Sequence, residues 1–541
     1  MKSMSFKRNE KMEQITLDDS FYRLSERNQK IVLSSWAKDF AEVVFPAINE
    51  DRFSVLYSDK SFSRPNTPVN IIVGALILKE NGGLSDSELM ESICCDVRYQ
   101  YALHTTHLDE QPISDRTFSR FRERLYQYEI ETGRDLLAEE MGALTKVYAK
   151  HMNLHSNIKR MDSLMVATHS KRMSRLEIIY QVNSDAVFLL HKLGADELIT
   201  KEILHYLTPD DLNEVIYYCK GEDVQPRLEK ALLETDSLLR IMEDEQWHGY
   251  EEYQLLVRVA NEQGKHENGR LVPRENREIT PCSLQNPSDP DATYRKKAGK
   301  DYKGYTANLV EEVGKDGDGL IVDVAFAPNQ HSDSAFLKEY LEERGEEADS
   351  ETLIADGAYG GKANRELAEE KNVKLVTTAL TGIMPEEIFT RFEMNEDGRS
   401  VQKCPAGFIP IKSKYHEKSG SCRTVMSKEC CANCRYREYC HAKEQAKSWV
   451  VHVSRTKIDR ALYIKKLSTE EYKELTKKRN AIEGVMSVLR RRYHADDIPV
   501  FGYIQTKLFF KLKVAAYNFN KLLKYCRRSR AFCVQNQKCA G

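Results

Sequence analysis

The chain of 541 residues exceeds the size of one ordinary hydrophobic core, which predicts two or more domains or one domain with large insertions. Its 41% hydrophobic and 30% charged residues are typical of a soluble globular protein. The formal net charge of −2 hides an uneven distribution, because residues 453–530 hold 20 Lys and Arg against 7 Asp and Glu, a local net charge of +13. A basic C-terminal region in a near-neutral chain indicates a polyanionic partner.

Membrane and secreted classes are excluded by three features. The best apolar run, residues 71–78, is too short for a membrane helix. The N-terminus carries Lys2, Lys7 and Arg8 without a following apolar stretch, unlike a secretory signal. Thirteen cysteines, an odd number in a long chain, indicate reduced thiols rather than a disulfide framework. We therefore expect a cytoplasmic protein.

Residues 1–150 predict an all-α N-terminal domain. An apolar helix over 68–78 ends at Gly82-Gly83, and Ser85 with Glu88 forms a capping box for a second helix. A third helix starts after Ser114, and four arginines share its polar face: Arg116, Arg120, Arg122 and Arg124. Short helices, a glycine turn and an arginine-rich helix favour a helix-turn-helix-like DNA reader. The alternative is a helical bundle with a solvated basic face.

From residue 151 onward, strand patterns alternate with helices. Strands are predicted at 157–166, 304–310, 320–326, 352–356 and 373–377, and helices at 332–344 and 362–371. Two β-runs followed by α-β-α-β indicate a mixed sheet with right-handed crossovers, so 151–541 is predicted as an α/β domain. Residues 175–290 form a helical insertion, with helices expected at 176–193, 210–219, 227–243 and 251–261.

A cysteine-rich insertion is predicted over 383–452. Cys431 and Cys434 are spaced as a Cys-x2-Cys pair, and Cys404 and Cys440 complete a possible set of four thiolates for a tetrahedral zinc site. A structural Zn²⁺ would stiffen an insertion too small for its own core. The alternative is a set of ordinary free thiols.

A basic helix around Glu483 opens the final segment, 470–525, which also holds basic C-terminal helices. Its apolar residues recur at helical spacing and predict a buried stripe: Ile482, Val485, Met486 and Leu489. Arg479, Glu483 and Arg490 share a second face at the edge of that stripe. A carboxylate between guanidiniums suits a metal ligand beside a phosphate backbone. The alternative is a surface helix with an Arg–Glu ion pair.

Three carboxylates are the candidate catalytic residues. Asp162 lies within the first predicted strand, Asp356 ends the strand at 352–356, and Glu483 lies on the basic helix. Separations of 194 and 127 residues mean that only the fold could bring them together. Three carboxylates around two Mg²⁺ (or Mn²⁺) ions suit phosphodiester chemistry. Asp301, Asp323 and Asp333 are weaker candidates.

These motifs resemble bacterial insertion-sequence transposases of the DDE type. The first acid lies in Arg160-Met-Asp162-Ser-Leu and the second in Ile354-Ala-Asp356-Gly-Ala-Tyr359. The third lies in Arg479-x3-Glu483-x6-Arg490, similar to the family signature Tyr-x2-Arg-x3-Glu-x6-Lys. The chain departs from that signature twice, with Thr476 in place of Tyr and Arg490 in place of Lys.

The resemblance implies a ribonuclease H-like catalytic core that cleaves the ends of an insertion element and transfers the strands to target DNA. Asp162, Asp356 and Glu483 would then bind two Mg²⁺ ions, and Arg479 and Arg490 would position phosphates. The helix carrying Arg116, Arg120 and Arg122 would bind the terminal inverted repeats. A DNA-bound homo-oligomer in the bacterial cytoplasm is expected. The alternatives are a domesticated, non-catalytic DNA-binding protein and a nuclease that only hydrolyses DNA.

Overall fold

The computed structural model describes residues 4–10, 19–58, 64–108, 110–297, 299–314, 317–345, 348–378 and 386–539. The chain divides into two compact units, which are described separately below. The first unit holds residues 1–156, 162–332 and 484–541, and the second holds 157–161 and 333–483. The predicted start of the cysteine-rich insertion at 383 lies outside the described residues. The predicted domain boundary at 150 and the insertion bounds remain predictions.

The first unit begins with an all-α region, as the sequence predicts. Its helices are α1 (Glu26–Ser34), α2 (Trp36–Asp39), α3 (Val69–Gly82), α4 (Asp86–Cys95), α5 (Val97–Ala102), α6 (Asp115–Thr132) and α7 (Leu136–His151), and two short strands, β1 (Met4–Ser5) and β2 (Arg64–Pro65), pair in parallel. Gly83 ends α3 with φ of +67°, a left-handed conformation that glycine adopts without strain. The predicted capping box of Ser85 and Glu88 starts α4. The arginine-rich helix of the sequence analysis is α6. It does not directly follow α4, because α5 and a connecting segment lie between them.

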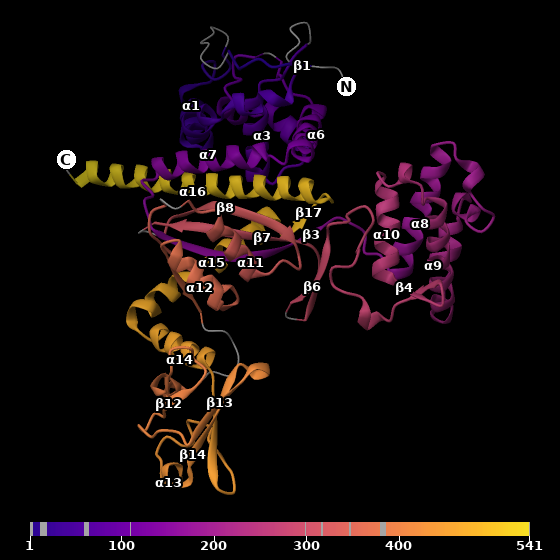
Figure 1. Cartoon of the computed structure of the whole chain (residues 1–541). Coiled ribbons are helices and arrows are strands. Elements are labelled where there is room, and N and C mark those ends of the chain that lie inside the picture. The colour runs from indigo at the N-terminus through magenta and orange to yellow at the C-terminus, as the bar shows by residue number, and fades with distance from the viewer. Residues whose placement is uncertain are drawn as a thin grey trace. The chain divides into compact units, whose positions relative to one another are not determined.

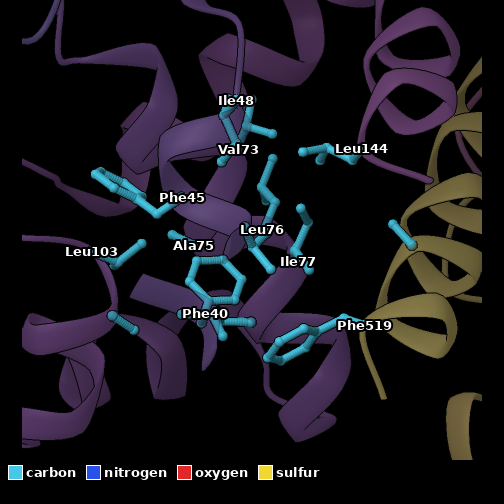
Figure 2. Packing of buried hydrophobic residues seen from close by; sticks show 14 of the residues in the cluster. Phe40, Phe45, Ile48, Val73, Ala75, Leu76, Ile77, Leu103, Leu144 and Phe519 are labelled. Atoms are coloured by element: carbon cyan, nitrogen blue, oxygen red, sulfur yellow. The ribbon is translucent and has the colours of Figure 1, made fainter. Parts of the chain in front are cut away.

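An apolar core joins the N-terminal helices to the last helix of the chain, α16 (Tyr503–Cys539). Figure 2 shows Phe40, Leu76 and Phe519 of α16 pointing into this core. The rings of Phe40 and Phe519 meet edge to face with their centroids 5.1 Å apart. Helix α16 packs against α3, α7 and strand β8 (Gly319–Pro328), and the yellow helix in Figure 1 lies along these elements. Its burial makes α16 part of the core of the first unit.

Most of the mixed sheet also belongs to the first unit. Strand β3 (Ile158–Thr168) lies beside β7 (Lys300–Val313), which pairs in antiparallel fashion with β6 (Thr293–Lys297) and β8, and β17 (Asp497–Ile498) pairs with β3 in parallel. Gly304 of β7 has φ of +129°, and a Cβ there would lie 2.4 Å from the carbonyl oxygen of Val166 on β3. Only glycine therefore allows the two strands to approach this closely.

The helical insertion is also part of the first unit. It contains α8 (Arg175–Lys192), α9 (Val224–Ile241) and α10 (Glu251–Gln263), with a hairpin of β4 (Gly264–Glu267) and β5 (Arg270–Pro273). These helices pack around a cluster of their own apolar side chains. The predicted helix at 210–219 forms over most of its length, because residues 211–217 are helical, with a π-helix at Asn213–Tyr217.

In the second unit, β3 contributes only its first residues. Residues 158–160 pair in parallel with β9 (Glu351–Ala355), which pairs in parallel with β10 (Val373–Thr377). Helix α11 (Asp333–Glu342) packs against α12 (Lys362–Glu370), and α12 packs against β10. The α/β alternation predicted from the sequence is confirmed here, and the mixed α/β class is confirmed for the chain.

The cysteine-rich insertion follows in the same unit. Its strands are β11 (Glu393–Met394), β12 (Val401–Lys403), β13 (Lys412–His416), β14 (Ser421–Ser427), β15 (Lys443–Glu444) and β16 (Ser448–Val453), with helix α13 (Lys428–Ala432) after β14. Four of the strands form an antiparallel sheet in the order β13-β14-β16-β15. Helices α14 (Arg455–Leu467) and α15 (Glu470–Tyr493) come next, and α15 continues into the first unit from Gly484. Within the described residues, no helix has the length and apolar character needed to cross a membrane.

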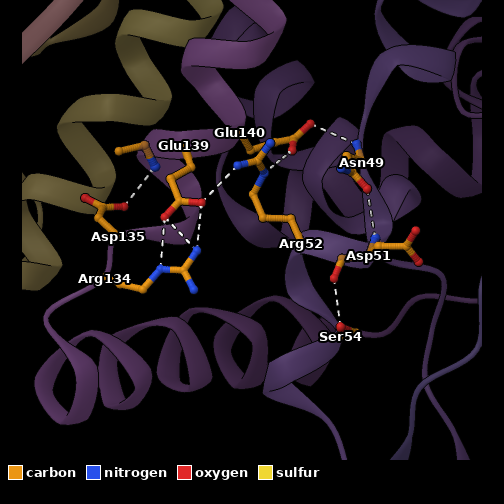
Figure 3. Close-up of polar contacts among 9 residues, drawn as sticks. Asn49, Asp51, Arg52, Ser54, Arg134, Asp135, Glu139 and Glu140 are labelled. Atoms are coloured by element: carbon orange, nitrogen blue, oxygen red, sulfur yellow. Dashed lines mark hydrogen bonds and ion pairs between the residues drawn. The ribbon is translucent and has the colours of Figure 1, made fainter. Parts of the chain in front are cut away.

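Buried ion pairs hold charged side chains within the N-terminal helices. Arg52 contacts Glu139 and Glu140, with an Nε–Oε2 distance of 2.9 Å to the fully buried Glu140 (Figure 3). Burial raises the pKa of Glu140, although the hydrogen bonds from the Asn49 amide and Arg52 oppose that rise. Similar pairs connect α16 to the same helices, including Lys513 Nζ to Glu80 Oε2 at 2.8 Å. Both side chains of this pair are at most 10% exposed, and Lys79 Nζ lies 3.8 Å from the other carboxylate oxygen of Glu80, Oε1.

Replacing Lys513 with Met should lower the free energy of unfolding by about 3 kcal/mol, because Glu80 would stay buried without its closest cation. Urea-induced unfolding followed by tryptophan fluorescence measures the change. Arg8→Met is the matched control, because it breaks the exposed pair with Asp51 and should cost at most about 1 kcal/mol. Equal stability of the two variants would contradict a structural role for the buried pair.

Candidate functional site

The helix predicted around Glu483 forms as α15, with the expected buried stripe. Ile482, Val485, Met486 and Leu489 are each at most 5% exposed. The Glu483 side chain is 65% exposed, so the same turn places its carboxylate in solvent. Glu483 therefore occupies the edge of the helix, where a carboxylate is available to a ligand.

The second unit fixes the first half of α15 in two ways. Tyr472 of this helix packs into a small buried cluster with Ile354 of β9 and Val376 of β10. Arg160 of β3 is 4% exposed and donates from Nη1 to the backbone carbonyl of Lys478 at 2.8 Å. Lys478 immediately precedes Arg479 in the chain. These contacts therefore fix the position of Arg479 relative to strands β9 and β10.

Arg479 lies between two of the three predicted acids. Its guanidinium is 3.4 Å from Asp356 (Nη2 to Oδ2) and 3.5 Å from Glu483 (Nη1 to Oε1). The Arg479 side chain is only 16% exposed, whereas that of Asp356 is 47% exposed. The structure thus brings Asp356, Arg479 and Glu483 together, with one cation partly compensating two carboxylates.

Hydrogen bonds fix the orientation of Asp356. It follows β9 directly, and its Oδ1 accepts hydrogen bonds from the Gly357 amide and, at 2.9 Å, from the Thr378 hydroxyl. Thr378 also accepts from the Gly357 amide at 2.9 Å. Oδ1 therefore accepts hydrogen bonds from residues that follow β9 and β10, and Oδ2 faces Arg479. Sequence reasoning missed Thr378, although a polar residue directly after the neighbouring parallel strand is a usable signal.

Asp162 belongs to the first unit and is described by itself. It lies within β3, is half-buried, and its Oδ1 accepts a hydrogen bond from the Ser163 amide at 2.9 Å. The weaker candidate Asp301 accepts a hydrogen bond from the exposed Tyr294 hydroxyl at 2.7 Å. Asp333 is the first residue of α11, as expected for a helix start.

The predicted DNA-binding arginines differ in their surroundings. Arg116, Arg120 and Arg490 are exposed, and no ion pair with a described residue involves them. Arg122 is 16% exposed, forms an ion pair with Asp86, and lies 5.3 Å from the ring centroid of Phe509. Burial alone would raise the pKa of Asp86, but hydrogen bonds from Arg122 and Lys79 bring it below its usual value. Arg122 therefore has an internal role that Arg116 and Arg120 lack.

The four predicted zinc-binding thiols affect one another. Burial, then the charges of Cys434, Cys404 and Cys431, raises the pKa of Cys440 to about 12. Burial and the neighbouring thiols likewise raise the pKa of Cys431 to about 11. Cys404 and Cys434 each begin a backbone turn. Gly407 N–H donates to the Cys404 carbonyl at 2.8 Å, and Arg437 N–H donates to the Cys434 carbonyl at 3.1 Å. All four are free cysteines.

The described side chains are not arranged as a metal-binding site. Among the described residues, no group of three or more His, Cys, Asp and Glu side chains has an arrangement that could hold a metal ion. The donor chemistry nevertheless fits hard divalent ions at Asp356 and Glu483, since both offer solvent-accessible carboxylate oxygens. Among the described residues, Arg479 is the cation that forms an ion pair with each of them.

Comparison with known families gives two matches, one near each end of the chain. Residues 403–523 match a family model described as Transposase DDE domain, and residues 31–124 match one described as Transposase domain (DUF772). No curated protein and no solved structure matches the chain.

The mixed α/β fold is consistent with these matches, and both matched family models are described as transposase domains. The matches support the resemblance to insertion-sequence transposases of the DDE type and, in general terms, a transposase function. The first match includes Arg479, Glu483 and Arg490, whereas Asp162 and Asp356 lie outside it.

Proposed function

We propose that this protein is a DNA transposase that cleaves the ends of an insertion element and joins the freed strands to target DNA. The observation that carries this proposal is the arrangement of Asp356 and Glu483 around Arg479, in a chain whose residues 403–523 match a Transposase DDE domain. The two carboxylates would bind metal, and the guanidinium would hold a phosphate once the metal takes over charge compensation.

Asp162 is proposed as the third metal ligand. Strands β3 and β9 run in parallel, and Arg160 pairs with Ile354. Asp162 comes two residues after Arg160, in the motif Arg160-Met-Asp162-Ser-Leu, which resembles that of the first acid in DDE transposases. When bound, two divalent ions such as Mg²⁺ would activate the attacking water or 3′-hydroxyl and stabilise the leaving oxygen. Arg490, which follows Glu483 by seven residues in α15, is proposed to bind a neighbouring phosphate.

Two other functions use the same residues. A nuclease that only hydrolyses DNA would share the acids, and strand-transfer products from a labelled 3′-OH end distinguish it from a transposase. A domesticated, non-catalytic DNA-binding protein would bind the ends without cleaving them. The presence of all three acids supports an active enzyme over this alternative. Action on DNA as a homo-oligomer in the bacterial cytoplasm is part of the proposal.

Replacement of the acids tests the catalytic site. Asp162→Ala, Asp356→Ala and Glu483→Gln should each reduce Mg²⁺-dependent cleavage on the order of 10³-fold or more, while DNA carrying the repeats that flank the reading frame still binds. Gel-based cleavage and binding assays on the purified variants measure both quantities. Asp301→Ala is the matched control, because this carboxylate accepts a hydrogen bond from the Tyr294 hydroxyl and contacts neither Arg479 nor the other proposed acids, and it should cleave normally. Near-normal cleavage by Glu483→Gln would remove the third acid from the site.

The N-terminal helices are proposed to bind the terminal repeats through Arg116 and Arg120. Arg120→Ala should weaken binding and lower the slope of log affinity against log salt by about 0.9, because one phosphate contact is lost. Arg122→Ala serves as the comparison, since it breaks the pair with Asp86 and should instead lower thermal stability. Titrations at several salt concentrations measure the slope. An unchanged slope for Arg120→Ala would mean that this face is merely solvated.

A structural zinc ion held by Cys404, Cys431, Cys434 and Cys440 is also proposed, because thiols that raise one another's pKa lose that repulsion when a cation binds them as thiolates. Protein purified without added metal should contain about one zinc per chain by elemental analysis. Cys434→Ser should abolish zinc binding, and the exposed Cys94→Ser should retain it. Zinc-free wild-type protein of normal thermal stability would leave the four residues as ordinary thiols.

A further inference from the structure

A cavity of about 270 Å³ lies directly beside Asp356, entirely within the second unit. Its walls come from the segment after β9, the start of α12, the end of β10 and helix α14. Gly357 and Thr378, which donate the two hydrogen bonds to Asp356 Oδ1, are both part of its lining. A molecule in this cavity would therefore lie next to a proposed metal ligand.

Positive charge in the lining is poorly compensated. Arg365 of α12 and Arg460 of α14 are half-buried, and neither forms an ion pair with a described carboxylate. The acidic member of the lining, Asp459, pairs with Arg455 on its own helix at 3.3 Å. A half-buried guanidinium loses hydration and regains interaction energy only from an anion or an aromatic surface. Arg365 contacts the ring of Tyr463, but neither guanidinium forms an ion pair with a described residue, so the cavity suits an anionic ligand.

The cavity is also lined by an aromatic side chain, Tyr463, whose position is fixed by hydrogen bonds. The Tyr463 hydroxyl accepts a hydrogen bond from the Thr377 amide at 2.9 Å and donates to the Thr377 carbonyl at 3.1 Å, which fixes the ring. The Arg365 guanidinium lies 4.8 Å from the centroid of that ring, and Ile464 adds an apolar surface. A fixed aromatic ring and a guanidinium plane are surfaces on which nucleobases stack.

The volume limits the ligand to a small unit. Pockets for small molecules begin at roughly 300 Å³, so this cavity accommodates about one nucleotide and excludes a base pair of a duplex. Gly361 lines the cavity with an extended backbone, and a Cβ there meets no atom within 4 Å. A larger side chain at this position would therefore be accepted by the backbone and would occupy open space.

We propose that this cavity binds a single unpaired nucleotide of a DNA strand, with its phosphate on Arg365 and Arg460 and its base against Tyr463. The inference rests on the proposed function for its substrate, DNA, and adds a site that would hold one nucleotide beside Asp356. The nucleotide would be removed from its base pair, since the cavity has no room for the partner base. Arg365, Arg460 and Tyr463 are then positioning residues for the strand.

Fluorescence of 2-aminopurine tests the proposal with the full chain in metal-free buffer. Titration with 2-aminopurine deoxyribonucleoside 5′-monophosphate, and with a single-stranded oligonucleotide carrying one 2-aminopurine, should give saturable quenching as the base stacks. The oligonucleotide should bind more tightly than the mononucleotide. Arg365→Gln and Gly361→Leu should each weaken binding at least about 10-fold, by loss of the anion contact and by filling of the cavity. Arg435→Gln removes the same charge from an exposed site in the cysteine-rich insertion and should bind normally.

Four outcomes would overturn the proposal: no saturable quenching with the wild-type chain, an equal loss in Arg435→Gln, inorganic phosphate competing as well as the nucleotide, or tight binding of the mononucleotide without competition by single-stranded DNA. The third would reduce the cavity to an anion site, and the fourth would make it a site for free nucleotides. Glu483→Gln separates this inference from the proposed function, because it should bind the nucleotide normally while losing cleavage. Nucleotide binding by a wild-type chain that never cleaves DNA would refute only the proposed function.

Discussion

The burial of helix α16 is the constraint on which the first unit depends. This helix contributes Phe519 to the core of the N-terminal helices, and its lysines must enter that interior with it. Acidic residues of the N-terminal helices compensate them: Glu80 pairs with Lys513, and Asp135 pairs with Lys511 at 2.9 Å. Removing one partner of such a pair leaves a desolvated charge, so the pairs specify how the helices associate as much as they stabilise them.

This compensation changes the meaning of the basic C-terminal composition. Several of the positive charges counted over residues 453–530 neutralise acids elsewhere in the chain, as Arg530 does for Asp39. The same holds for Arg122, which pairs with Asp86. A surplus of lysine and arginine therefore overestimates the surface that is available to DNA. The exposed, unpaired arginines are the better guide to a polyanion contact.

At the candidate site, charge compensation is left incomplete. Arg479 balances only one of the two carboxylates that it contacts, and half-buried Arg365 and Arg460 form no ion pair with a described acidic residue. Stable interiors pair their charges, so unbalanced acids next to unbalanced guanidiniums favour a site that is completed by its ligands. Bound cations would compensate the charge of the carboxylates, and bound phosphates would compensate the charge of the guanidiniums. The cavity beside Asp356 fits this division.

The sequence by itself determined the elements and the chemistry they carry. Hydrophobic periodicity located the buried stripe of α15, a Gly-Gly pair and a capping box located the α3–α4 turn, and short apolar runs located β9 and β10, because these signals depend only on near neighbours. The resemblance of three short motifs pointed to Asp162, Asp356 and Glu483, and no long-range contact was needed for that choice.

Only the tertiary structure decided which charged groups meet. Residues 356 and 479 are far apart in the chain, and their contact follows from the packing of Tyr472 on the strands and from the bond of Arg160 to α15. The hydroxyl of Thr378 on Asp356, the pairing of Arg122 and the cavity beside Asp356 are likewise products of packing. Side-chain identity fixes what a residue can bind, but the burial and the partners that select among those possibilities depend on segments that are distant in sequence.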